Sequence, residues 1–113
     1  MKEQERSGIG FIGFGEVGSA LSQRIKETGG EVVVYDKFPD AVQEKAERLG
    51  IQLVVTLEDL VNSSRFILSC VWPDVASDTA REVVPLLSPE KIFCDMNSIS
   101  PETTEEIERG LAR

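Results

Sequence analysis

The sequence predicts an α/β domain with a doubly wound parallel sheet, strand order 3-2-1-4-5 and helices on both faces. Two observations carry this prediction. Short apolar, β-branched runs alternate with segments whose apolar residues recur every three or four positions. The connections are short, and no repeat, linker or low-complexity stretch divides the chain, so we expect a single domain over residues 1–113.

Each element has a local signal. The run at 8–14 is nearly all apolar and ends in glycines, as expected of a strand buried on both faces. Pro39 opens the second helix and Gly50 follows its end, Thr56 heads a weak capping signature, and Pro85 ends or kinks the fourth helix. We expect strands at 8–14, 31–36, 51–55, 65–72 and 91–96, and helices at 16–27, 38–50, 56–63, 74–84 and from Pro101 onward.

Composition and charge exclude several function classes. With 12 basic and 20 acidic residues the net charge is −8, which disfavours binding to nucleic acid or to an anionic membrane. No apolar run approaches the roughly 20 residues of a membrane helix, and the polar N-terminus shows no signal peptide. Histidine is absent, and Cys70 and Cys94 lie within apolar runs. We therefore expect a cytoplasmic protein with two reduced, buried thiols and no metal site.

The stretch 13–18, which we call the glycine turn, has the pattern G-x-G-x-x-G between a predicted strand and a predicted helix. Gly13 would permit the tight turn, Gly15 would let a pyrophosphate approach the backbone, and Gly18 would let the helix pack on the first strand. The first N–H groups of the helix, at its positive dipole end, would then receive the phosphates.

Asp36 ends the second predicted strand, 21 residues after Gly15 and close to the roughly 20 expected of a dinucleotide fingerprint. Its carboxylate would accept hydrogen bonds from the adenosine ribose and repel a 2′-phosphate, which favours NAD over NADP. Lys37 weakens this preference, because it could sit beside such a phosphate. Together these residues indicate a Rossmann-type fold that binds a nicotinamide dinucleotide, NAD first and NADP as the alternative.

The glycine turn has two other possible interpretations. The turn could serve packing alone. It could also belong to a methyltransferase, whose first loop is usually entered by an acidic residue. Here Phe11 and Ile12 occupy that place, which disfavours a methyltransferase.

Two stretches of the sequence also resemble a known family. "IGFIGFGEVGSALSQRIKETGGEVVVYDKFPDA" resembles the start of the β-hydroxyacid dehydrogenases, which include 3-hydroxyisobutyrate and 6-phosphogluconate dehydrogenases, and "CDMNSISPET" (94–103) resembles their second signature. "YDKFPDA" is similar to the NAD-using hydroxyisobutyrate branch, whereas "DMNS" is closer to 6-phosphogluconate-like members. Val17 departs from the methionine common beside the last glycine.

The resemblance implies site residues. It assigns the pyrophosphate to Phe14, Gly15, Glu16 and Val17, the nicotinamide half to Val71, Trp72 and Pro73, and the nicotinamide and substrate edge to Asn97 and Ser98. For Trp72 the alternative is a partly buried aromatic that covers the end of the sheet. For Asn97 and Ser98 the alternative is helix capping ahead of Pro101.

The resemblance also implies parts that these residues lack. Family members carry their catalytic lysine in a helical second domain, and none of the five lysines here lies in such a context, so we name no catalytic residue. We expect the cofactor-binding half of a dehydrogenase of a small 3-hydroxy acid or sugar acid, inactive alone and prone to self-association through uncovered apolar surface. The second hypothesis is a stand-alone nucleotide-binding or sensing module without catalysis.

Overall fold

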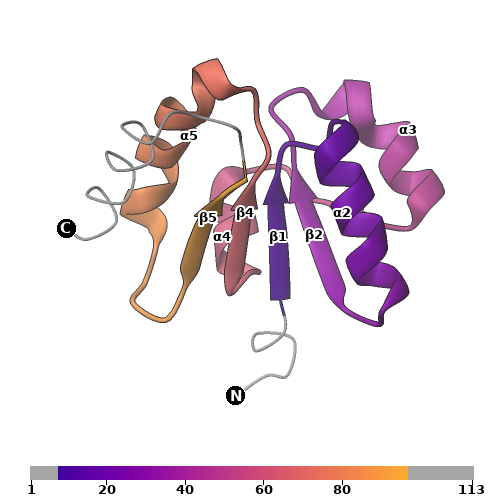
Figure 1. Cartoon of the computed structure of the whole chain (residues 1–113), viewed down its shortest axis with the longest axis horizontal. Helices are drawn as coiled ribbons and strands as arrows, with labels where there is room; N and C mark the ends of the chain where they lie inside the picture. The colour runs from indigo at the N-terminus through magenta and orange to yellow at the C-terminus, as the bar shows by residue number, and fades with distance from the viewer. Residues whose placement is uncertain (1–7, 97–113) are drawn as a thin grey trace.

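The sheet has five parallel strands in the order β3-β2-β1-β4-β5, which confirms the predicted topology (Figure 1). The computed structural model describes residues 8–96. Its strands are β1 (Gly8–Ile12), β2 (Glu31–Tyr35), β3 (Gln52–Leu53), β4 (Phe66–Ser69) and β5 (Ile92–Asp95). Its helices are α2 (Glu16–Glu27), α3 (Pro39–Leu49), α4 (Leu57–Asn62) and α5 (Ala76–Val83), with short 3-10 turns η1 (Pro73–Val75) and η2 (Val84–Leu86).

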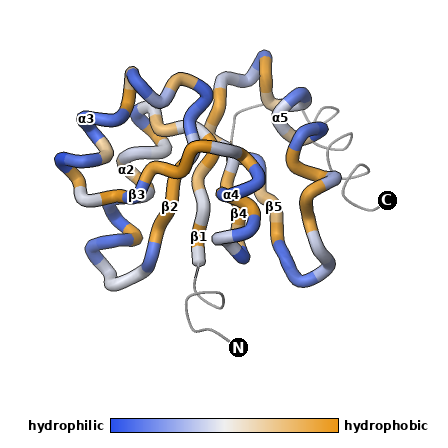
Figure 2. The backbone as a smooth tube through the Cα atoms, turned by 180° about the vertical axis from the view of Figure 1, so that it is seen from behind, coloured by the Kyte–Doolittle hydropathy of each residue, from blue (hydrophilic) through white to orange (hydrophobic). Residues whose placement is uncertain are grey.

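Two hydrophobic cores lie on opposite faces of the sheet, because neighbouring residues of a strand point to opposite sides. Phe11 belongs to the core under α2 and α3, and Ile12 belongs to the core under α4 and α5. Figure 2 shows hydrophobic residues along β2 and β5 and hydrophilic ones along α3. The first core contains Phe11, Phe14, Val34, Val42, Ala46 and Ile51. The second contains Ile12, Val54, Leu60, Val61, Ile67, Ala80, Val83 and Phe93.

The helix ends follow the predicted local signals. The Thr56 hydroxyl accepts a hydrogen bond of 3.0 Å from the Asp59 N–H and so caps α4. Gly50 ends α3 in the left-handed conformation, with φ of 69°, as a C-terminal glycine does. Pro85 lies in η2, where α5 has ended, because proline has no N–H to continue the helix.

All five strands are shorter than predicted, and β3 and β4 are shortened most. β1 ends at Ile12 instead of residue 14, because the glycine turn begins at Gly13. β3 has two residues instead of the expected 51–55, since the chain leaves the sheet after Val54, whose N–H still donates to the Val34 carbonyl, and exposes Val55. β4 ends at Ser69, not at residue 72, because the chain turns toward η1 and Pro73. The expected helix 74–84 is divided among η1, α5 and η2. The helix expected from Pro101 lies outside the described residues.

Candidate functional site

The edge of the sheet at which the five strands end, which we call the carboxyl edge, collects exposed apolar side chains. It lies at the top of Figure 1. Of the seven large exposed hydrophobic residues described, only Ile92 lies elsewhere, at the start of β5. The other six are Val17, Phe38, Val55, Trp72, Val75 and Met96. Ligands of open α/β sheets bind at this edge, so the residues around it form the candidate site.

The carboxyl edge also contains the switch point of the sheet, where the connections that follow two neighbouring strands lead to opposite faces. From β1 the chain passes to α2 on one face, and from β4 it passes through η1 to α5 on the other face. β1 and β4 are hydrogen-bonded neighbours, and the Cys70 N–H continues their ladder with a 2.8 Å bond to the Ile12 carbonyl. The segments that follow β1 and β4 diverge immediately above this bond, and a nucleotide usually binds at this position in a doubly wound sheet.

The glycine turn has the geometry that its spacing predicts. Gly13 has φ of 96°, and a Cβ there would lie 2.8 Å from the Cys70 carbonyl oxygen. A Cβ on Gly18 would overlap the Gly13 carbonyl oxygen, so glycine is needed for α2 to pack against the turn. A Cβ on Gly15 would meet nothing within 4 Å. Two of the three glycines are thus needed by the fold, and the third faces open space.

The start of α2 offers backbone N–H groups to that open space. Gly15 is the N-cap residue, and no side chain in residues 8–96 caps the helix there. Glu16 and Val17, in the first turn, are both exposed. The four leading N–H groups of a helix lack intrahelical acceptors and carry its positive dipole end, so this terminus can receive an anion.

Phe14 differs from its neighbours in the turn. Its ring is fully buried in the core under α2 and α3, with the Lys45 ammonium 5.0 Å from the ring centroid. Its N–H donates a 2.8 Å hydrogen bond to Asp36 Oδ2. Phe14 therefore anchors the glycine turn in the core and bonds it to the residue that follows β2. Residues 15–17 are exposed, and Gly18 packs against the Gly13 carbonyl.

Asp36 directly follows β2 and is half-buried. Besides the bond from Phe14, its Oδ1 accepts a 2.8 Å hydrogen bond from the Phe38 N–H. Lys37 is exposed beside it. The predicted ribose acceptor thus lies next to the glycine turn, as its spacing required.

The end of β4 brings Val71, Trp72 and Pro73 to the same edge. Val71 is half-buried and packs against the core under α4 and α5. Trp72 is 79% exposed and Pro73 is exposed, so the alternative of a partly buried Trp72 that covers the sheet is wrong. The reason is that the chain turns outward at Trp72 to begin η1.

Asn97 and Ser98 lie outside the described residues, and their assignment stays a prediction. The last described backbone bond is 2.9 Å from the Met96 N–H to the Ser69 carbonyl. Met96 therefore lies beside the end of β4, at the carboxyl edge.

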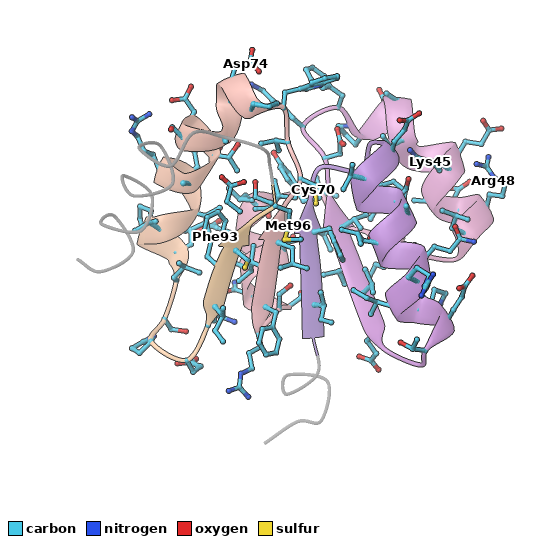
Figure 3. All side chains as sticks on the ribbon, in the orientation of Figure 1. Lys45, Arg48, Cys70, Asp74, Phe93 and Met96 are labelled. Atoms are coloured by element: carbon cyan, nitrogen blue, oxygen red, sulfur yellow. The ribbon has the colours of Figure 1, made fainter. Side chains whose placement is uncertain are left out.

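The two cysteines are both free, but the prediction that both are buried is wrong. Cys94 is exposed, because β5 lies at the edge of the described sheet and Cys94 pairs with Leu68 beyond the reach of α2 and α3. Cys70 is half-buried above the end of β1 (Figure 3). Burial and, secondarily, the Asp95 carboxylate raise the pKa of the Cys70 thiol from 9.0 to about 11.

Thiol labelling near pH 8 should therefore modify Cys94 first and Cys70 about a hundredfold more slowly than an unperturbed thiol, since two pKa units leave about a hundredth of the thiolate. Mass spectrometry of the labelled peptides measures both rates, and Cys94→Ser isolates Cys70. The neutral thiol is favoured in the fold, so this contribution to stability is complete below pH 9.0 and is lost as the pH rises through about 11. Equal labelling of both cysteines in the folded chain would contradict this assignment.

A model of the NAD-binding domain of 6-phosphogluconate dehydrogenase matches residues 8–113. The chain belongs to this family. The match covers both the glycine turn and the second signature, and it confirms the resemblance to β-hydroxyacid dehydrogenases. As a member of the 6-phosphogluconate dehydrogenase NAD-binding family, the chain is a nicotinamide-dinucleotide-binding domain by descent.

Relatives of this NAD-binding domain are longer proteins. The "uncharacterized 28.5 kDa protein in 7S RNA 5′ region" of Methanothermus fervidus is 34% identical over 99 residues, which are 88% of this chain and 39% of that protein. Human mitochondrial 3-hydroxyisobutyrate dehydrogenase is 23% identical over 109 residues, 93% of this chain and 32% of the enzyme. The chain thus spans 32% to 39% of the length of these relatives.

Solved structures agree with the family and the fold. A conserved protein described as similar to 3-hydroxyacid dehydrogenases superposes with a TM-score of 0.78 at 32% identity, over 92% of this chain and 39% of that one. The 3-hydroxyisobutyrate dehydrogenase of Mycobacterium tuberculosis superposes with a TM-score of 0.84 at 20% identity, over 94% of this chain and 36% of the enzyme, which shows the shared fold.

Over residues 8–96, no group of three or more His, Cys, Asp and Glu side chains is arranged to hold a metal ion. None of the helices in that part has the length and apolar character to cross a membrane.

Proposed function

We propose that this chain holds NAD, in preference to NADP, for an oxidoreductase that moves a hydride between nicotinamide and a small 3-hydroxy acid or sugar acid. The observation that carries the proposal is the meeting of two groups at the carboxyl edge. The uncapped start of α2 supplies N–H donors for a pyrophosphate, and Asp36 supplies acceptors for a ribose. Gly15 lies between them with no atom near the position of its missing Cβ.

Residues at the edge fit the separate parts of the dinucleotide. The N–H groups of Glu16 and Val17 would bind the pyrophosphate, and the Asp36 carboxylate would bind the adenosine ribose. Trp72 and Val71 would line the nicotinamide half, since they follow β4 on the other side of the switch point. Bound there, the nicotinamide would supply the hydride acceptor or donor, which no side chain can provide.

Charge supports NAD as the preferred form. A 2′-phosphate near Asp36 would add like charge, which costs about 1 kcal/mol in bulk water and about 4 kcal/mol near a protein surface for two unit charges about 4 Å apart. Lys37 is exposed, so solvent and salt screen its compensating charge. We expect NADH to bind at least about tenfold more tightly than NADPH, since about 1.4 kcal/mol corresponds to that factor.

The substrate and the chemical step belong to the wider proposal. Asn97 and Ser98 would contact the hydroxy acid, and the base that removes its hydroxyl proton would come from a helical second domain of the kind that family members carry. We expect no turnover by the 113-residue chain with NAD and a small 3-hydroxy acid. Turnover would show instead that the chain carries its own base.

Trp72 provides the direct test, because it is the only tryptophan in the chain and is 79% exposed. Tryptophan emission overlaps the absorption of reduced nicotinamide. NADH should therefore quench Trp72 and gain sensitised emission as it binds. Calorimetry and fluorescence with NADH and NADPH measure the two affinities.

Two controls separate binding from the Trp72 signal. Trp72→Phe should retain heat of NADH binding and lose the energy transfer, and ADP-ribose should displace NADH without producing it. Asp36→Ala should narrow the preference for NADH over NADPH. If neither nucleotide binds at millimolar concentration, the proposed function is wrong.

A further inference from the structure

We propose that Asp36 has a second role at the site: it is the positioning residue that holds the glycine turn in the shape that receives a pyrophosphate. The role rests on the proposed function, because it deepens the account of the same site. We call the hydrogen bonds from the Phe14 and Phe38 N–H groups to the two carboxylate oxygens the Asp36 bridge.

The Asp36 bridge continues the β1–β2 ladder into the turn. The ladder pairs Ile12 with Tyr35, and the Gly13 N–H then donates a 2.8 Å bond to the Tyr35 carbonyl. The next N–H, that of Phe14, donates to Asp36 Oδ2 at 2.8 Å. A side-chain oxygen therefore receives the N–H that would otherwise be the first unpaired donor of the turn.

Both ends of the Asp36 bridge are fixed. The Phe38 N–H holds Oδ1 at 2.8 Å and so sets the orientation of the carboxylate. The Phe14 ring is fully buried, so the backbone of the turn cannot move without disturbing the core. Gly15 and Glu16 follow Phe14 directly, so the fixed backbone of Phe14 determines where their N–H groups lie.

The bridge and the ribose contact are compatible. An ionised carboxylate has about four acceptor positions on its two oxygens, and the bridge uses one on each oxygen. The remaining positions can accept ribose hydroxyls. Asp36 would therefore orient the phosphate donors before the nucleotide arrives and bind the ribose afterwards.

This role makes a prediction opposite in sign to simple electrostatics. Asp36 is negative and close to the turn, so removal of its charge alone should tighten the binding of an anion. If Asp36 positions the turn, its removal should weaken that binding. The N–H groups at the start of α2 would then have to be ordered when the anion binds, and this ordering lowers the affinity. Inorganic pyrophosphate separates the two effects, since it has no ribose to contact Asp36.

The test measures pyrophosphate binding by NMR titration for wild type, Asp36→Asn and Asp36→Glu. We expect both variants to bind about fivefold or more weakly, since each loses at least one charge-assisted hydrogen bond in the bridge. Asp36→Glu keeps the charge and shifts the carboxylate, so it remains informative if Asp36→Asn folds poorly. The Phe14 amide should exchange with solvent faster in both variants, which a general loss of stability would not confine to this amide.

Two control variants match the charge change and the loss of stability. Asp40→Asn removes one negative charge in the first turn of α3, outside the Asp36 bridge, and should bind pyrophosphate as wild type does or more tightly. Thr56→Ala removes the cap of α4 and should lower stability without changing the affinity.

The possible results separate this role from the proposed function. If Asp36→Asn and Asp36→Glu bind pyrophosphate as tightly as wild type, or if wild type does not bind it, the positioning role is wrong. If wild type binds pyrophosphate, both Asp36 variants bind it more weakly and wild type does not bind NADH, the proposed function fails and the positioning role stands.

Discussion

Gly18→Ala is expected to lower the free energy of unfolding by about 3 kcal/mol, because a Cβ at this position would overlap the Gly13 carbonyl oxygen. The overlapped atom belongs to the backbone, and Gly13 is itself fixed by its N–H bond to Tyr35. Either α2 must move away from the sheet or the turn must change shape. Urea denaturation followed by circular dichroism measures the loss, and NADH binding should fall with it.

Gly15→Ala is the matched control for stability, since its Cβ would meet no atom within 4 Å. If Gly18→Ala unfolds at the same urea concentration as Gly15→Ala, then α2 does not pack on the turn as described. A selective loss of NADH binding by Gly18→Ala, at unchanged stability, would lead to the same conclusion.

Gly15→Ala itself should weaken NADH binding about tenfold to a hundredfold while costing at most about 1 kcal/mol of stability. The added methyl group would occupy the open space in front of the α2 N-terminus and keep a pyrophosphate away from its N–H donors. Gly15 has φ of −78°, which alanine can adopt, so the backbone conformation is not the cause. Calorimetric titration with NADH gives the change in affinity.

The result has a direct counter-test. Inorganic pyrophosphate should lose affinity for Gly15→Ala by a similar factor, because the methyl group obstructs the phosphates and not the adenosine. NADH binding equal to that of wild type would show that the pyrophosphate lies elsewhere on the carboxyl edge.

Most of the fold could be predicted from the sequence because its signals are local. Periodicity, Gly50, Thr56 and Pro85 each act within one turn of the chain, and each has the predicted effect. The lengths of β3 and β4 could not be predicted, because a strand ends where its neighbour's backbone diverges. That divergence depends on the packing of α4 and α5 and leaves no mark within residues 51–55 or 65–72.

The candidate site shows the same division. The positions of Gly13, Gly18 and Asp36 follow from a spacing that is tied to the fold. The bond between Phe14 and Asp36 does not, because it requires the register of β1 against β2 and the side-chain orientation of Asp36. The exposure of Cys94 could not be predicted for a related reason: an apolar run predicts a strand but does not tell which faces of that strand a helix covers.

β1 pairs with β2 on one side and β4 on the other, and this arrangement also bears on how the chain folds. The β1–β4 pairing joins Ile9 to Phe66 and closes a loop more than twice as long as the pairing of Gly8 with Glu31. The half with the glycine turn should therefore form early, and the half with Trp72 should join it later. A nucleotide that contacts both Asp36 and Trp72 would link the half that forms early to the half that joins later. At a concentration of a hundred times its Kd, its binding would raise the free energy of unfolding by about 2.7 kcal/mol.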